Sequence, residues 1–242
     1  MIKLIRGVTV VALFIFFGLG ALFVRYFVFP FQKVKIKQYE MLQKMWQLFV
    51  AIIEKIKIIK VEVNNLEKIK NIKNSIIVST HPSFIDIIIL ISIIPHSTCF
   101  VAKKLANNPF LKGMVDLLFI VEEDTEKWLS KCLDKLNSGL NVIIFPMGRR
   151  HEKDEYPKIK RGTSLIAQCC EKDIIMLDIQ TNIRFLKKNQ PVYEAGDSPI
   201  LYTIKYLGEI NTKEYLKKYS DSVTFKTEIT KLIKECLYQF KN

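Results

Sequence analysis

His81 and Asp86 are the residues of this chain whose types and spacing most clearly suggest chemistry. They lie in the segment 79–86, which follows a short apolar run expected to form a strand and precedes a run expected to form a helix. A carboxylate that accepts a hydrogen bond from one imidazole nitrogen fixes the tautomer and leaves the other nitrogen free to take a proton. The pair could therefore act as a general base and its orienting partner.

Pro82 determines whether these two side chains could meet. On one continuous helix, the steps between them would turn Asp86 about 140° away from His81. The residue before a proline is disfavoured in the helical region, so His81 is expected in an extended turn, with Pro82 opening the helix. From that turn the imidazole could fold back onto the carboxylate. In the alternative interpretation Thr80 is an ordinary helix N-cap and the pair is incidental, and this segment alone leaves both open.

A second group of residues could hold an anion. The apolar segment 142–145 leads through Pro-x-Gly, ending at Gly148, to Arg149 and Arg150. Guanidinium groups on a tight turn at a strand end are suited to bidentate contacts with phosphate, although a solvated basic loop would have the same composition. Helix N-termini favour anions as well, and a helix is expected to begin near Thr163. The further candidates for holding phosphate are Lys103, Lys160 and Arg161.

Several common active-site patterns do not occur in the sequence. It has no G-x-S-x-G elbow, Walker loop or H-E-x-x-H motif, which argues against a serine hydrolase, a P-loop NTPase and a zincin. The five cysteines have no C-x-x-C spacing, so neither a disulfide framework nor a metal site is expected. Without a visible protein nucleophile, the natural reaction is direct attack of a substrate hydroxyl, deprotonated by His81, on an acyl carbonyl.

The N-terminal segment predicts a membrane anchor. No charged residue occurs from Gly7 to Val24, and the apolar stretch is long, carries bulky Phe residues to its end and has no A-x-A-like cleavage site. These features favour a retained anchor over a cleaved signal peptide. Basic residues are in excess on its C-terminal side, which predicts a cytoplasmic location for the body of the protein. The next segment, 33–57, has helical apolar spacing that suits either a core-facing or an interfacial helix.

The remainder of the chain alternates between strand and helix patterns. This order predicts an α/β fold, a mixed sheet flanked by helices. Strands are expected at 59–63, 76–78, 99–102, 118–121, 142–145, 174–179 and 201–207. Helices are expected near 84–94, 105–117, 125–137, 163–170 and 225–240.

The chain is strongly basic, with 37 Lys and Arg against 24 acidic residues and a formal charge of +13. Such a charge attracts nucleic acid, an anionic membrane surface or phosphorylated substrates. A genome rich in A and T also produces many Lys and Ile codons, so charge alone selects none of these. Because no zinc finger or RNA-binding aromatic motif accompanies it, and because an apolar anchor does, no nucleic-acid partner is expected.

Four blocks of the chain, in their order and spacing, resemble the glycerolipid acyltransferases, which include the 1-acylglycerol-3-phosphate and other lysophospholipid acyltransferases. The segment from Thr80 to Asp86 is similar to the family motif N-H-x-x-x-x-D, with Thr in place of Asn. Residues 145–150 resemble F-P-E-G-T-R, and residues 160–162 resemble a following K-R-G segment. Other family blocks look like 101–113 and 174–179. The similarity covers roughly residues 60 to 210.

This resemblance implies a glycerol-3-phosphate acyltransferase-like fold and a membrane enzyme of phospholipid biosynthesis. It implies transfer of a fatty acyl group from acyl-CoA or acyl carrier protein to a hydroxyl of a lysophospholipid such as 1-acylglycerol-3-phosphate. His81 would be the general base, Asp86 its partner and Arg150 a phosphate ligand, with no metal and no bound cofactor. The expected division is an anchor at 1–32, an interfacial helix at 33–57 and an acyltransferase domain at 58–242, on the cytoplasmic side of the inner membrane.

The sequence departs from the family pattern at two positions. Met147 stands where the family has Glu, and Arg149 stands where it has Thr. The family Glu is thought to help bind the acceptor or shape the site. Three outcomes are therefore open: an altered acceptor, a weakened enzyme, or a membrane-tethered protein that binds lipid or phosphate without turnover.

Overall fold

The computed structural model describes residues 2–32, 34–100, 119–120, 124–148, 150, 157–183 and 198–239. Within these residues a seven-stranded sheet has the order β1-β7-β6-β2-β5-β3-β4. The run from β6 to β4 is parallel, β7 lies antiparallel to β6, and β1 lies parallel to β7. The strands are β1 (Ile59–Val63), β2 (Ile76–Ser79), β3 (Ser97–Phe100), β4 (Phe119–Ile120), β5 (Asn141–Ile144), β6 (Ile174–Thr181) and β7 (Ile200–Ile210).

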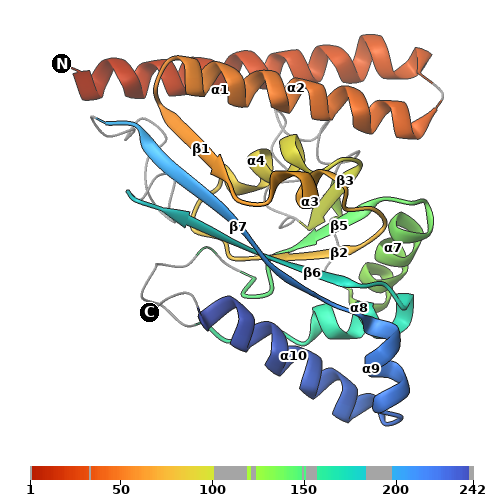
Figure 1. Cartoon of the computed structure of the whole chain (residues 1–242). Coiled ribbons are helices and arrows are strands. Elements are labelled where there is room, and N and C mark those ends of the chain that lie inside the picture. Colours follow the sequence, from red (N-terminus) through yellow and green to blue (C-terminus); the bar gives the residue numbers. More distant parts are fainter. Residues whose placement is uncertain are drawn as a thin grey trace.

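Helices cover both faces of this sheet (Figure 1). Helices α1, α2 and α4 lie on one face, drawn at the top, and α7, α8 and α10 lie on the other. The mixed sheet flanked by helices that the sequence predicts is thus confirmed. The helices are α1 (Ile2–Phe23), α2 (Lys35–Lys55), α3 (Leu66–Lys70), α4 (Asp86–Ile93), α7 (Thr125–Asn137), α8 (Gly162–Cys170), α9 (Thr212–Lys218) and α10 (Ser222–Gln239).

The apolar runs of the central strands supply two separate cores. On β2, Ile77 packs into the core beneath α1, α2 and α4, whereas Ile76 and Val78 pack into the core formed with α7, α8 and α10. Successive side chains of a strand point to opposite faces of the sheet, so a strand covered on both faces needs apolar residues at every position. This explains why β2 and β5 appear in the sequence as continuous apolar runs without alternation.

Helix α1 lies against the rest of the protein and also presents an exposed apolar face. Its Phe17 ring meets the Phe49 ring of α2 edge to face, with centroids 4.7 Å apart. Its Arg6 donates to the carbonyl oxygens of Lys57, at 2.8 Å, and of Ser198, at 2.9 Å. The stretch Leu4–Val28 is long and apolar enough to cross a membrane, a property that core helices and signal sequences share.

Several element boundaries differ from those expected. Helix α4 begins at Asp86, so Pro82 lies in the preceding turn and not in the first turn of the helix. The short helices α3 and α9 were not predicted, because five or seven residues are too few to show a periodic pattern. The helix expected at 105–117 and the end of the strand expected at 99–102 lie outside the described residues.

A buried asparagine at the start of β5 joins two neighbouring connections. The Asn141 side-chain oxygen accepts from the Ser75 N–H at 3.0 Å, and its amide nitrogen donates to the carbonyl oxygens of Ile72, at 3.1 Å, and Pro95, at 2.8 Å. These backbone groups precede β2 and β3, the two strands that lie on either side of β5. Asn141 therefore fixes how three strands enter the sheet.

Replacing Asn141 by Ala should lower the free energy of unfolding by about 2–4 kcal/mol, because three buried backbone groups would lose their partner. Guanidinium titration in detergent, followed by far-UV circular dichroism, measures the change. Asn137→Ala is the matched control, since Asn137 is exposed at the end of α7. Equal stability of the two variants would contradict the role given to Asn141.

Candidate active site

The turn between β2 and α4 brings His81 and Asp86 together. The His81 Nδ1 atom lies 2.9 Å from Asp86 Oδ2, and the two side chains are 13% and 0% exposed. A carboxylate beside Nδ1 holds the proton on that nitrogen, so Nε2 of the neutral ring has no proton and can accept one. This is the arrangement expected with His81 in a turn and Asp86 in the helix.

Asp86 receives a second hydrogen bond from the backbone of the same turn. The Ser83 N–H donates to Asp86 Oδ2 at 2.7 Å, while Oδ1 is buried without a hydrogen-bond partner among the described residues. Burial raises the pKa of Asp86, and the hydrogen bond and charge of His81, the Ser83 N–H and the charge of Arg150 act in the opposite direction. The carboxylate is therefore anchored through one oxygen only.

Phe145 holds the imidazole from a neighbouring strand. Its ring stacks on His81 with centroids 4.0 Å apart and an angle of 18° between the planes. Phe145 directly follows β5, which pairs in parallel with β2, so the ends of the two strands place the rings face to face. Phe145 was not predicted from the sequence as a residue of the site. A signal was present, since both residues follow apolar runs that form adjacent strands.

Thr80 ties the turn to the strand on the other side of β2. Its hydroxyl donates to Asp178 Oδ1 at 2.8 Å and accepts from the Ile179 N–H at 2.7 Å. Both partners belong to β6, and Asp178 is buried. The alternative that Thr80 caps the helix is wrong, because the N-cap position of α4 is Ile85 and has no side-chain hydrogen bond. The residue before His81 is thus fixed by β6.

The structure describes only some of the residues that were predicted to hold phosphate. Arg150 interacts electrostatically with Asp86, which places its charge near the couple. Gly148 has a φ of +68°, and a Cβ there would lie 2.6 Å from Lys160 Nζ, so only glycine allows both the turn and the close ammonium. Arg161 occupies the exposed N-cap position of α8. Lys103 and Arg149 lie outside the described residues.

Met147 is part of the core. It is 4% exposed and belongs to the cluster formed with α7, α8 and α10, which also contains Ile144 and Ile159. A side chain that packs there contributes to stability and brings no charge to the turn. In the part of the chain that the structure describes, His, Cys, Asp and Glu side chains do not gather in threes around a point where a metal could bind.

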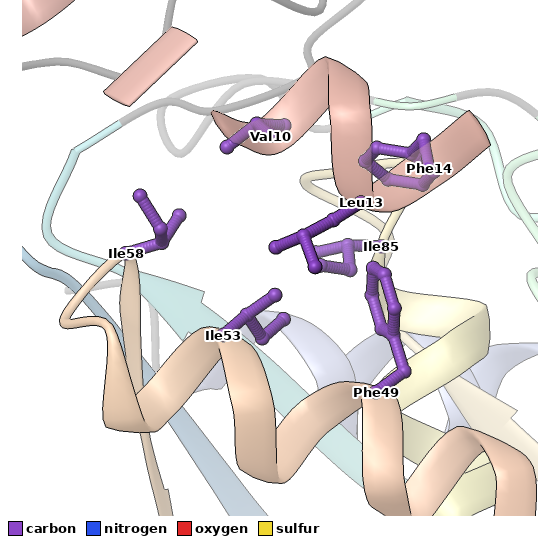
Figure 2. Close-up of a pocket in the computed structure, with 7 residues that line it drawn as sticks. All are labelled: Val10, Leu13, Phe14, Phe49, Ile53, Ile58 and Ile85. Carbon is purple, nitrogen blue, oxygen red and sulfur yellow. The ribbon is translucent and has the colours of Figure 1, made fainter. Parts of the chain in front are cut away.

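An apolar pocket adjoins the turn on the side of α1 (Figure 2). Its lining includes Ile85, the residue directly before Asp86, which is 1% exposed. The wall opposite comes from the two N-terminal helices and the start of β1. Asp86 itself is buried beside this pocket, and its burial is the physical cause of its raised pKa. The other lining residues are Val10, Leu13, Phe14, Phe49, Ile53 and Ile58.

Comparison with known proteins shows the family to which the chain belongs. A family model described as Acyltransferase matches residues 60–180. A 1-acyl-sn-glycerol-3-phosphate acyltransferase from Helicobacter pylori is 31% identical over 179 residues, which cover 65% of this chain and 76% of that protein. The crystal structure of the 1-acyl-sn-glycerophosphate (LPA) acyltransferase PlsC from Thermotoga maritima has a TM-score of 0.72, covering 99% of this chain and 95% of that one. At 17% identity, the latter shows a shared fold.

Replacing Asp86 by Asn should leave the protein as stable as the parent at neutral pH, or more stable. A carboxyl whose pKa is raised on folding destabilises the native state as the pH rises through that raised pKa, and Asn removes this effect. The difference between variant and parent should therefore shrink as the pH falls. Thermal unfolding across a pH series measures it.

Asp134→Asn serves as the control for this series, because Asp134 is an exposed residue of α7. A neutral-pH loss of several kcal/mol in Asp86→Asn would show that the charge of Asp86 stabilises the fold, contrary to this account.

Proposed function

Because this chain belongs to the acyltransferase family and is an acyltransferase enzyme, we propose that it transfers a fatty acyl group from a thioester to a hydroxyl of a lysophospholipid. The observation that carries this proposal is the contact between His81 Nδ1 and Asp86 Oδ2, which leaves Nε2 as an acceptor for a proton. We further propose 1-acylglycerol-3-phosphate as the acceptor. The name of the Helicobacter pylori relative and the cations near the turn support this choice.

The reaction follows from the position of the base. His81 Nε2 removes the proton of the acceptor hydroxyl while its oxygen attacks the thioester carbonyl, and the resulting imidazolium is stabilised by Asp86. Collapse of the tetrahedral intermediate breaks the bond to sulfur, and the departing thiolate takes the proton from His81. An ester and a free thiol are formed, and the base is regenerated. Acyl-CoA and acyl carrier protein present the same thioester, so either donor is a substrate for this chemistry, which needs no bound cofactor.

The acceptor phosphate is held by the cations around Gly148. Arg150 is near enough to Asp86 to affect its pKa, so a phosphate bound there would lie close to the base. Lys160 packs its ammonium against Gly148 and adds a second charge at the same turn. We propose Lys103, Arg149 and Arg161 as further contacts of the phosphate or of the acyl donor. Guanidinium and ammonium groups together suit an anion that carries up to two charges.

The residue at position 147 affects which lysophospholipid the site favours as acceptor. The family has a carboxylate at this position, whereas here the side chain is apolar and buried. The loss of one negative charge beside Gly148 leaves the turn more positive. A more positive site favours a phosphomonoester, such as that of 1-acylglycerol-3-phosphate, over a zwitterionic headgroup. The substitution is therefore compatible with turnover on the most acidic of the common lysophospholipids.

Replacing His81 by Asn should lower the rate of acyl transfer by about 10²- to 10⁴-fold, the usual contribution of a positioned general base. Purified protein in detergent would be given 1-acylglycerol-3-phosphate with radiolabelled acyl-CoA, and separately with acyl carrier protein. His96→Asn is the matched control, because His96 contacts Glu40 at the surface and its φ of +46° suits Asn. Near-full activity of the His81 variant with either donor would refute the mechanism.

We also propose that the exposed face of α1 attaches the protein to a membrane, with the catalytic domain on the cytoplasmic side. Phe16 is 68% exposed, Leu19 53% and Phe23 59%, and all three lie on this helix. Large apolar side chains grouped on one helix face are costly in water. We propose residues 1–32 as the anchor, 33–57 as the helix next to the lipid surface and 58–242 as the domain that carries the reaction, with membrane lipids as its partners.

Replacing Phe16, Leu19 and Phe23 together by Ser should weaken binding to phospholipid vesicles, since each buried apolar side chain contributes about 1.5–3 kcal/mol. Cosedimentation with the vesicles measures the bound fraction. The control carries Ser at Val223, an exposed apolar residue of α10, which lies on the other face of the sheet from α1 (Figure 1). Unchanged sedimentation of the α1 variant would exclude this face as the site of attachment.

A further inference from the structure

Two buried polar atoms near the turn lack a hydrogen bond of ordinary geometry. Asp86 Oδ1 and the hydroxyl of Tyr202 are both inaccessible to water, and among the described residues neither has a partner at the usual distance and angle. Tyr202 lies on β7, pairs with Thr181 of β6 and is 0% exposed. Each such atom costs roughly 1–3 kcal/mol when it is left unsatisfied. Two such atoms close to the same turn call for a common explanation.

The two atoms belong to the same enclosed region. Burial raises the pKa of Tyr202, the charge of Asp86 raises it further, and a weak hydrogen bond with the Ser83 side chain lowers it. Asp86 and Ser83 both belong to the turn that holds His81. A phenol has one rotatable hydrogen, so Tyr202 can donate to the carboxylate oxygen that has no donor. Hydrogen bonds of catalytic groups are often long in a free enzyme and shorten when substrate binds.

A packing role alone does not account for a tyrosine here. Phenylalanine would fill the same volume and would bury no hydroxyl, and a buried tyrosine hydroxyl usually has a partner. The ring of Tyr202 already lies in the core beneath α1, α2 and α4, so the hydroxyl is the part that needs an explanation.

We propose that Tyr202 is a positioning residue of the His81–Asp86 couple, whose hydroxyl donates to Asp86 Oδ1, directly or through one buried water, during turnover. This inference rests on the proposed function. The bond orients the carboxylate so that Oδ2 faces His81, and it stabilises the ionised form that burial disfavours. The charged and titratable groups that face Asp86 among the described residues are His81, Arg150 and Tyr202.

Tyr202→Phe tests the proposal, because it removes the hydroxyl and leaves the ring. The expected loss in kcat is about 5- to 30-fold, equivalent to one or two kcal/mol, with KM for the acceptor almost unchanged. The acidic limb of the kcat profile should move to higher pH, since without the donor Asp86 takes up a proton at a higher pH. An unchanged kcat and acidic limb, with a raised Tm, would show a hydroxyl that only fills space and would overturn the proposal.

Tyr206→Phe is the matched control. Tyr206 lies on the same strand and the same face as Tyr202, and its hydroxyl contacts Glu209 at 3.2 Å at the exposed end of the sheet. This variant should keep the parent kcat and pH profile. An equal loss in both variants would indicate a general effect of the strand and would also overturn the proposal.

A double-mutant cycle separates positioning from folding. If Tyr202 acts through Asp86, Tyr202→Phe should change kcat by less than about twofold in the Asp86→Asn background. Additive losses would contradict the proposal even where Tyr202→Phe lowers stability. If the proposed function itself is wrong, the result is different, because His81→Asn would then retain activity. Loss of activity in His81→Asn together with a fully active Tyr202→Phe would refute the positioning role alone.

Discussion

A carboxylate withdrawn from water is the constraint on which the rest of the site depends. Asp86 is fully buried at the first position of α4, where an ionised group would be several kcal/mol less stable without compensation. The Ser83 N–H, the positive end of the helix and the nearby Arg150 supply that compensation. His81 is the other partner of the carboxylate, through Nδ1. The interactions that offset the burial of Asp86 thereby also fix the orientation of the imidazole that we propose as the base.

The parallel part of the sheet explains how distant residues meet around this couple. The carboxyl ends of adjacent parallel strands open at the same edge of a sheet, where sites of α/β proteins commonly form. Here β5 brings Phe145 to one face of the imidazole, and β6 brings Asp178 to the hydroxyl of Thr80. His81, the proposed base, is therefore held by the strands on both sides. A substitution in β5 or β6 would therefore alter the position of the His81 ring even where the substituted residue does not contact that ring.

The sequence predicted the parts of the site whose geometry is local. His81 and Asp86 belong to one turn, and the proline between them restricted the backbone enough to show how they could meet. Thr80 was open to two interpretations because its true partner, Asp178, is reached only once β2 and β6 are known to be neighbours. The same holds for Phe145 and β5. Tyr202 was beyond prediction, since apolar patterning does not reveal that β7 runs antiparallel beside β6 and places this residue opposite Thr181.

The N-terminal helices and the turn that holds His81 pack together. The pocket lined by α1 and α2 reaches Ile85, so the apolar layer that bears the exposed face of α1 packs beside the residue directly before the buried Asp86. Hydration of this layer would lower the pKa of Asp86 and weaken the charge-assisted bond to His81 by screening it. Arg6 joins α1 to the backbone just before β1 and just before β7, at one end of this pair of parallel strands. The helix proposed as the anchor is thus tied to the sheet that carries the proposed base.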